Sequence, residues 1–200
     1  MPEFAEVTQI LKNIQSGNAQ WDDLLPSLYE ELKRMAHGHL RNERQNHTLN
    51  TTALVHEAFF KLVDQNRMTW ESRQHFLAIA SLAMRRVLMT YAQQRTTDKR
   101  KIDQIAFSLE EIDGANFNQL TPQNCQILLL LDEALTQLEQ ENPKAARIVE
   151  YRFFGGLTHE EIGQVLGTSA ITVRRQWVLA KTWLRKTMNA YSRNAEASST

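Results

Sequence analysis

The sequence predicts an all-α protein made of two small helical domains that a flexible acidic linker joins. Apolar residues recur at helical spacing through both halves, and the 200 residues include only 7 glycines and 4 prolines, which disfavours a turn-rich β architecture. Between the halves, residues 102–125 show no helical period and carry acidic but no basic side chains. A loop of this length is unusual inside one compact domain. We therefore expect domains at 1–101 and 126–190, with a frayed tail at 191–200.

Composition and charge limit the classes of protein to which this chain can belong. Apolar residues make up 42% and charged residues 23%, which is typical of a globular protein and unlike a disordered one. Lys+Arg and Asp+Glu are 23 each, so a uniformly basic coat is excluded. Cys125 is the single cysteine, which excludes an internal disulfide and a cysteine-rich zinc site. The sequence shows no secretion signal and no apolar run long enough to cross a bilayer, so we expect a cytoplasmic protein without membrane contact.

Four helices are expected in the first domain. Apolar spacing predicts one at residues 4–14, a second at 25–40, and a third at 54–63 after capping candidates at 50–52. Ser72 is a suitable N-cap for a long fourth helix. The buried stripe of that helix is expected to consist of Phe76, Ile79, Ala80, Ala83, Val87 and Tyr91.

The second domain is expected to be helical as well. Its first helix stops near Asn142-Pro143 and has an apolar stripe formed by Leu128, Leu131, Leu135 and Leu138. Another helix follows at residues 146–153, and Gly155-Gly156 closes it. These two helices precede the stretch with the strongest local signals.

Capping signals define two consecutive helices after residue 157. Thr158 and Glu161 have the spacing of a capping box, and Gly167 is suited to the left-handed conformation that ends a helix. Ser169 can then cap the next helix. The core stripe of this last helix is expected to be Val173, Trp177, Ala180 and Leu184.

The outer face of the last helix is basic. Residues 170–195 carry six basic and no acidic side chains. Two helices joined by a glycine turn, the second with a basic outer face, form the helix-turn-helix design, in which the start of the second helix enters the major groove. The DNA-binding candidates, which offer hydroxyl, amide and basic groups to phosphates and bases, are Ser169, Thr172, Arg174, Arg175, Gln176 and Lys186. The alternative interpretation is an ordinary helical hairpin with solvated basic residues.

Three segments, in order, resemble the extracytoplasmic-function (ECF) sigma factors, the smallest sigma subunits of bacterial RNA polymerase. Residues 146–186 are similar to the region of that family that binds the −35 promoter element. Residues 52–64 resemble the helix that docks on the clamp helices of the polymerase β′ subunit, and residues 75–101 resemble the helix that reads and opens the −10 element. The resemblance covers approximately residues 20–187.

The resemblance implies a polymerase-docking face on the helix at residues 52–64. Its candidate contacts are Leu54, His56, Glu57, Phe60, Lys61 and Asp64. His56 stands where many family members carry a glutamine-rich acidic signature. Without the resemblance, the same pattern is compatible with a plain surface helix. The second domain is expected to contact the polymerase β flap.

The resemblance also implies a −10 contact, in which unpaired bases stack on aromatic groups and basic groups hold phosphates. A basic cluster at residues 95–101 ends the long helix, and its alternative interpretation is a solvated helix end. The candidates for this contact are Trp70, Arg85, Arg86, Arg95, Lys99, Arg100 and Lys101. Trp70 is the expected stacking residue, and phosphate contacts of this kind make binding salt-dependent.

The predicted function is a promoter-specificity subunit without catalytic residues, cofactor or metal. Its partners would be core RNA polymerase and promoter DNA, and the resemblance allows an anti-sigma factor. Two alternatives stay open: a stand-alone helix-turn-helix regulator, and a helical metal-dependent hydrolase. The hydrolase has little support, because His37 and His39 would point to opposite sides of a helix and His56-Glu57 lacks a second histidine at metalloprotease spacing. No phosphate-binding glycine loop is present either.

Overall fold

The computed structural model describes residues 9, 11–14, 16, 18, 29–36, 51–63, 71–96 and 121–197. Every secondary-structure element in these ranges is an α-helix, which confirms the predicted fold class. After a helical segment at 29–36, the labelled helices are α3 (Thr51–Val63), α4 (Arg73–Arg95), α6 (Pro122–Glu141), α7 (Pro143–Phe153), α8 (His159–Leu166) and α9 (Ala170–Ala197). Of the expected linker, residues 102–120 lie outside the described residues.

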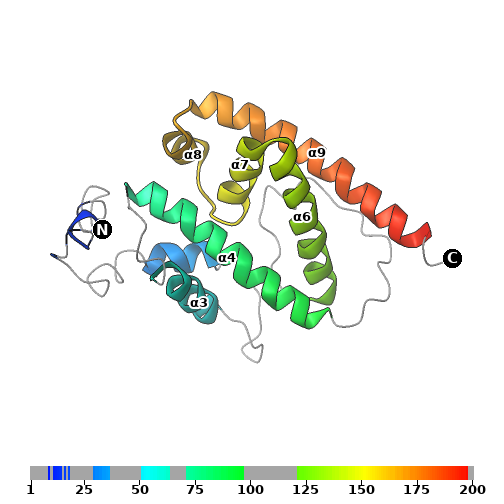
Figure 1. The fold of residues 1–200 in the computed structure, drawn as a ribbon, viewed down its shortest axis with the longest axis horizontal. Coiled ribbons are helices and arrows are strands. Elements are labelled where there is room, and N and C mark those ends of the chain that lie inside the picture. The colour runs from blue at the N-terminus through cyan, green and yellow to red at the C-terminus, as the bar shows by residue number, and fades with distance from the viewer. Residues whose placement is uncertain are drawn as a thin grey trace.

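Helix α4 crosses the middle of the molecule and is covered on two sides (Figure 1). It packs against α3 on one side and against α6, α7 and α8 on the other. The predicted stripe from Phe76 to Tyr91 is buried, as expected. A second buried stripe, formed by Leu77, Met84 and Leu88, lies beside it. The two stripes make α4 the common core helix of the described structure.

Side-chain caps fix where the helices begin. Ser72 Oγ accepts a hydrogen bond from the His75 amide at 3.1 Å, as the sequence predicted. Thr121 caps α6, which begins at Pro122, so the last residues of the segment expected to be linker are helical. Proline is well tolerated in a first helical turn, because the amide hydrogen that it lacks has no partner within the helix there.

Helix α9 continues beyond residue 190, where the sequence predicts fraying. Its helical backbone extends to Ala197. Tyr191 donates a hydrogen bond from its hydroxyl to Gln137 Oε1 of α6 at 2.8 Å. This contact and the buried Met188 extend the packing of α9 along α6 beyond the predicted stripe.

The turn between α8 and α9 has the local geometry that its sequence predicts. Thr158 and Glu161 form a complete capping box, and Gly167 is left-handed with φ 60°. Ser169 Oγ accepts a hydrogen bond from the Thr172 amide at 3.2 Å. A Cβ atom added at Gly163 would lie 2.7 Å from the Thr168 carbonyl oxygen. Glycine at position 163 therefore allows α8 to approach the turn closely.

We expect Gly163→Ala to destabilise the fold, although alanine favours helix formation by about 1 kcal/mol. The new methyl group must displace backbone, which typically costs about 1–3 kcal/mol. Urea unfolding should show a net loss of about 1 kcal/mol, and Gln164→Ala at the exposed neighbouring position should change stability by less than about 0.5 kcal/mol. A Gly163→Ala variant as stable as the parent would contradict the close approach.

Candidate nucleic-acid interface

The start of α9 presents a polar and basic surface to solvent. Ser169, Thr172, Arg174 and Arg175 are exposed, and the Ser169 and Thr172 hydroxyl oxygens lie 2.9 Å apart. The structure also places Ile171 here, with 83% of its surface exposed. Two further candidates from the sequence complete the set, partly buried Gln176 and exposed Lys186. Hydroxyl, guanidinium and apolar groups therefore lie together at the start of one helix.

The buried face of α9 agrees with the prediction. Val173, Trp177, Ala180 and Leu184 are all buried. Helix α9 packs through this face against α6, α7 and α8. Because these contacts fix the rotation of the helix about its axis, the candidate DNA-binding residues point outward.

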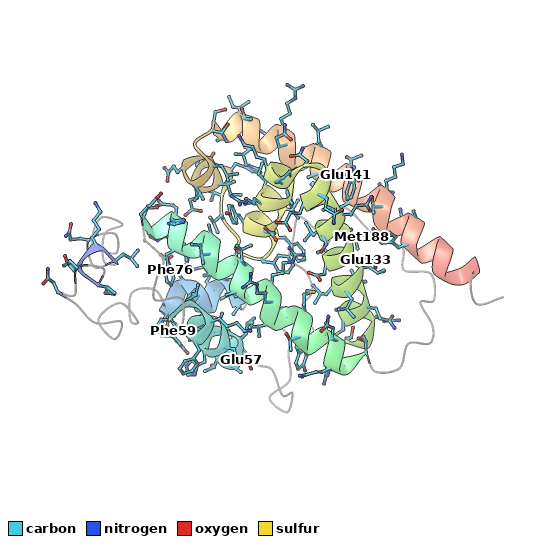
Figure 2. The ribbon with its side chains drawn as sticks, viewed as in Figure 1. Glu57, Phe59, Phe76, Glu133, Glu141 and Met188 are labelled. Atoms are coloured by element: carbon cyan, nitrogen blue, oxygen red, sulfur yellow. The ribbon has the colours of Figure 1, made fainter. Side chains whose placement is uncertain are left out.

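Helix α3 presents a mixed surface with one large apolar group. His56, Glu57 and Lys61 are exposed, and 68% of the Phe60 surface is accessible; Glu57 is labelled in Figure 2. The structure does not place Leu54 on this surface. Its side chain is fully buried, because α3 packs its apolar face against α4. Leu54 therefore belongs to the core, and the remaining candidate, Asp64, lies outside the described residues.

The structure places the described candidates for a −10 contact in different surroundings. Arg86 is exposed on α4. The Arg95 guanidinium carbon lies 5.4 Å from the centre of the Tyr91 ring, a cation–π arrangement that leaves the side chain partly exposed. Arg85 lies within a polar cluster between helices. The other candidates, Trp70, Lys99, Arg100 and Lys101, lie outside the described residues.

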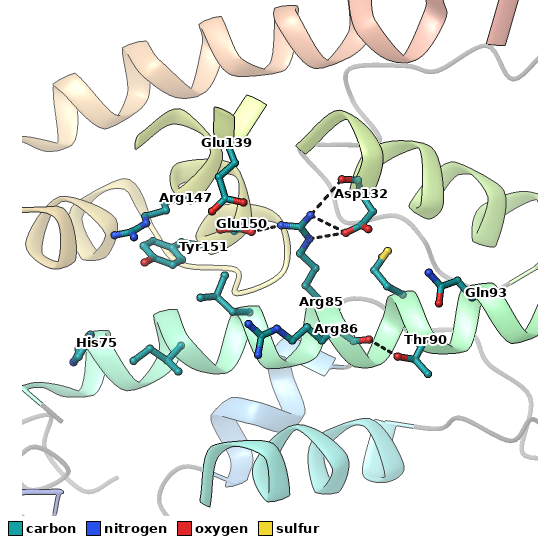
Figure 3. Close-up of a pocket in the computed structure, with 13 residues that line it drawn as sticks. His75, Arg85, Arg86, Thr90, Gln93, Asp132, Glu139, Arg147, Glu150 and Tyr151 are labelled. Atoms are coloured by element: carbon teal, nitrogen blue, oxygen red, sulfur yellow. Dashed lines mark hydrogen bonds and ion pairs between the residues drawn. The ribbon is translucent and has the colours of Figure 1, made fainter. Parts of the chain in front are cut away.

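Arg85 joins α4 to α6 and α7 through two carboxylates (Figure 3). Its Nε donates to Asp132 Oδ1 at 2.8 Å, and its Nη2 lies 2.7 Å from the same oxygen. Its Nη1 donates to Glu150 Oε1. The Arg85 side chain is 13% exposed and the Glu150 side chain 8%. This arrangement differs from the expected contact with DNA, because both carboxylates occupy the guanidinium.

Burial makes the Glu150–Arg85 pair sensitive to the loss of either partner. Desolvation raises the pKa of Glu150, and the neighbouring Arg85 charge only partly opposes that effect. Removing one partner of a buried ion pair costs about 3–5 kcal/mol, whereas the intact pair contributes little net stability because both charges lose their hydration. Loss of one partner is therefore expected to destabilise the fold far more than replacement of the whole pair by apolar residues of similar volume.

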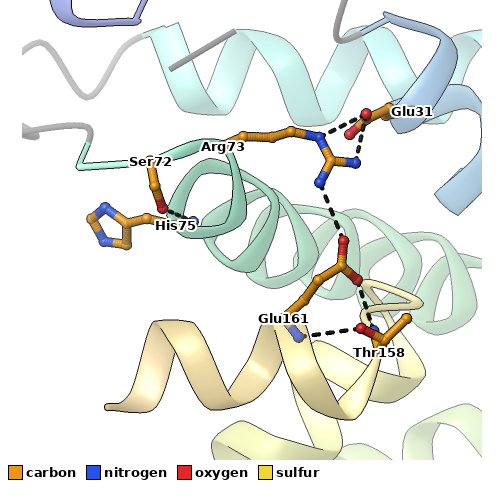
Figure 4. A network of polar contacts seen from close by, with 6 residues as sticks. All are labelled: Glu31, Ser72, Arg73, His75, Thr158 and Glu161. Atoms are coloured by element: carbon orange, nitrogen blue, oxygen red, sulfur yellow. Dashed lines mark hydrogen bonds and ion pairs between the residues drawn. The ribbon is translucent and has the colours of Figure 1, made fainter. Parts of the chain in front are cut away.

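Arg73 forms a second bridge at the start of α4 (Figure 4). Its Nη2 lies 2.6 Å from Glu31 Oε1 of the segment at 29–36, and its Nη1 lies 3.2 Å from Glu161 Oε1 of α8. Only 6% of the Arg73 side chain is exposed. Burial acts to raise the pKa of Glu161, but hydrogen bonds from Thr158 and Arg73 outweigh it and lower the pKa.

An open groove of about 620 Å³ adjoins the Arg85 cluster between α4, α6 and α7. Side chains of both charges line it, among them Arg86, Arg147 and Glu139. Within the described ranges, no group of three or more metal-ligating side chains is gathered, and His37 and His39 are outside those ranges. A separate search of the described helices found none that is long and apolar enough to span a membrane.

Comparison with known proteins identifies the family. A family model described as ECF sigma factor matches residues 4–190. The chain is an ECF sigma factor. Searches of curated proteins and of solved structures gave no match. Members of this family bind core RNA polymerase and promoter DNA in transcription initiation and are not enzymes.

The sequence of this ECF sigma factor does not indicate the polar bridges by any motif. Asp132, Glu150, Glu31 and Arg73 were not among the candidate functional residues. One feature of the sequence could have indicated that these arginines are buried: Arg73 and Arg85 lie on a helix whose other positions are largely apolar. Sequence alone did not reveal which acidic residues would face them, because those residues come from other parts of the chain.

The stability that Glu161 provides is expected to depend on pH. A carboxyl group whose pKa is lowered in the folded state stabilises the fold above its ordinary value of 4.5, and this contribution disappears as the pH falls through the lower folded value. Glu161→Gln should be less stable than the parent at pH 7 by about 1–3 kcal/mol, with the difference shrinking toward pH 3. The matched control is Glu160→Gln, an exposed neighbour in the same first turn. Urea unfolding at both pH values measures this, and a difference that is constant with pH would contradict the assignment.

Proposed function

We propose that this sigma factor is a promoter-specificity subunit that contacts core polymerase and promoter DNA through three surfaces. The start of α9 binds the −35 element, α4 with the residues after it binds the −10 element, and α3 docks on the β′ clamp helices. The α6–α9 half contacts the β flap. The observation that carries the proposal is the acid-free polar surface at the start of α9, in a chain that the ECF family model covers almost completely.

The −35 contact is supported by the chemistry of the exposed groups on α9. Arg174 and Arg175 can bind guanine or phosphate, and Ser169 and Thr172 can donate hydroxyl hydrogens to phosphate oxygens. Ile171 adds an exposed methyl-rich group of the kind that contacts the thymine methyl. The α8–turn–α9 unit would act as a helix-turn-helix that inserts this end into the major groove.

The docking contact is supported by the exposed side chains of α3. Phe60 is a large apolar group surrounded by charged neighbours, which is the composition of an interface anchor. Glu57 and Lys61 flank it and would set the orientation of the polymerase contact. The deciding experiment is capture of the tagged full chain by bacterial core RNA polymerase. Absence of capture together with tight DNA binding by the chain alone would favour a stand-alone regulator.

Arg175→Ala is expected to weaken binding to −35 DNA about tenfold, since a lost specific contact costs about 1–3 kcal/mol. If Arg175 contacts phosphate, the slope of log K against log salt should also fall by about 0.9. Fluorescence anisotropy on duplexes selected from a random library with the full chain measures both quantities. Arg185→Ala, which removes an exposed charge farther along α9, is the control and should have a smaller effect. Equal binding by the parent and Arg175→Ala would exclude this residue from the interface.

Glu57→Lys is expected to reduce capture by core polymerase about tenfold while leaving binding to −35 DNA unchanged. The charge reversal changes the electrostatics of the proposed α3 interface without altering the core, because Glu57 is exposed. Glu133→Lys, which reverses the charge of an exposed side chain on α6, is the matched control and should be captured like the parent. Equal loss of polymerase and DNA binding would indicate misfolding and refute the docking assignment.

A further inference from the structure

Helix α9 exposes apolar side chains beyond the polar and basic surface at its start. In the described part of the chain, four large hydrophobic side chains are exposed, and three of them belong to α9. These are Ile171, Val178 and Leu179, with 83%, 53% and 56% of their surfaces accessible. Helices α6, α7 and α8 cover the other face of α9, which runs along one edge of the molecule (Figure 1). Single exposed apolar residues are common on proteins, but three of them within about three turns of one helix indicate an interface.

Ile171 and Val178 point in nearly the same direction from α9. Each residue turns an α-helix by about 100°, so positions seven apart differ in direction by only about 20°. Leu179 points about 100° away from Val178 and about 80° away from Ile171. The rise along the helix from Ile171 to Val178 is about 10.5 Å. These two β-branched side chains therefore form an apolar row along the outer face of α9, and Leu179 lies beside that row.

Basic side chains border the apolar row on both sides. Four exposed cations flank it, Arg174 and Arg185 on one side and Arg175 and Lys186 on the other. Residues 170–195 contain no acidic side chain. This charge favours a polyanion as the partner of the row. It opposes pairing with the same face of a second copy of the chain, because like charges would then meet across the interface.

Double-stranded DNA offers both groups that this face can contact. The C5-methyl of thymine is an apolar group at the base edges of the major groove, and charged phosphates border that groove. In zinc fingers, helix positions spread over about two turns contact three successive bases. A helix that lies along the groove would therefore bring Ile171 and Val178 to base pairs about two or three steps apart. The flanking arginines and lysine would lie near phosphates and guanines.

We propose that Val178 is a specificity-determining residue that contacts a thymine methyl in the −35 element, about two or three base pairs from a thymine methyl contacted by Ile171. The inference rests on the proposed function and adds the sequence that the −35 site selects, an element with A·T pairs at both positions. It also extends the DNA contact of α9 from the first turn of the helix to Val178.

The test replaces thymine by deoxyuridine, which removes only the methyl group and leaves base pairing unchanged. Duplexes are first selected from a random library by the full chain together with bacterial core RNA polymerase. Binding is then measured with deoxyuridine at each thymine position of the −35 element in turn. Binding by the parent should fall about fourfold at two positions about two or three base pairs apart, the effect expected for one buried methyl group.

Three variants assign these methyl groups to side chains. Val178→Ala should make binding insensitive to the methyl at one position and keep the fourfold effect at the other. Ile171→Ala should show the reverse pattern. Leu179→Ala is the matched control, because it truncates an equally exposed apolar side chain beside the row, and it should keep both effects. All three positions are exposed, so circular dichroism should show unchanged helix content.

Each outcome decides the proposal. Loss of sensitivity to one thymine methyl in Val178→Ala, but not in Leu179→Ala, supports it. A selected −35 element without two such thymines, or deoxyuridine effects that Val178→Ala leaves unchanged, overturns it while −35 binding stands. Weaker capture of Val178→Ala by core polymerase with unchanged base preference would assign the row to a protein contact and overturn it as well. If the parent selects no sequence at all, the proposed function fails, and this inference fails with it.

Discussion

The fold depends on the burial of α4 from two sides. A helix covered by α3 on one side and by α6, α7 and α8 on the other cannot direct its cationic side chains freely to water. Arg73 and Arg85 must therefore find carboxylates inside the molecule, because an unpaired buried charge is far more costly than a paired one. This requirement places acidic residues on four other helical segments, the one at 29–36 and helices α6, α7 and α8, and it links parts of the chain that are distant in sequence.

The DNA contact that we propose for α4 and the packing of this helix inside the molecule compete for one set of groups. Family membership makes the chain a transcription-initiation factor that binds DNA, and the basic side chains of α4 are our proposed contacts for the −10 element. Arg86 is open to solvent, whereas Arg85 is occupied by Asp132 and Glu150. Such a division follows from geometry, since adjacent residues on a helix point about 100° apart. One cation then faces the neighbouring helices while the next faces water.

The α8–turn–α9 unit is organised differently, through local contacts. Thr158, Gly167 and Ser169 set the helix ends, and Gly163 lets α8 approach the turn. These features act within a few residues of one another. Glu161 links the local contacts of this unit to the packing of α4, because the carboxylate that completes the capping box also binds Arg73 of α4. A change in the packing of α4 therefore reaches the first turn of α8 through a single side chain.

The sequence by itself determined the helical class, the family resemblance, the caps at Ser72, Thr158 and Ser169, and the buried stripe of α9. These features depend on interactions within one or two turns of chain, which residue spacing records directly. Only the tertiary structure decided that Leu54 is a core residue, that α4 carries a second buried stripe, and that Arg85 pairs with Asp132 and Glu150. Leu54 and Phe60 are equally apolar in the sequence, and the direction from which α4 approaches α3 decides which of them is covered. Ion pairs between residues 47 and 65 positions apart depend on how whole helices pack, and helical periodicity carries no information about that.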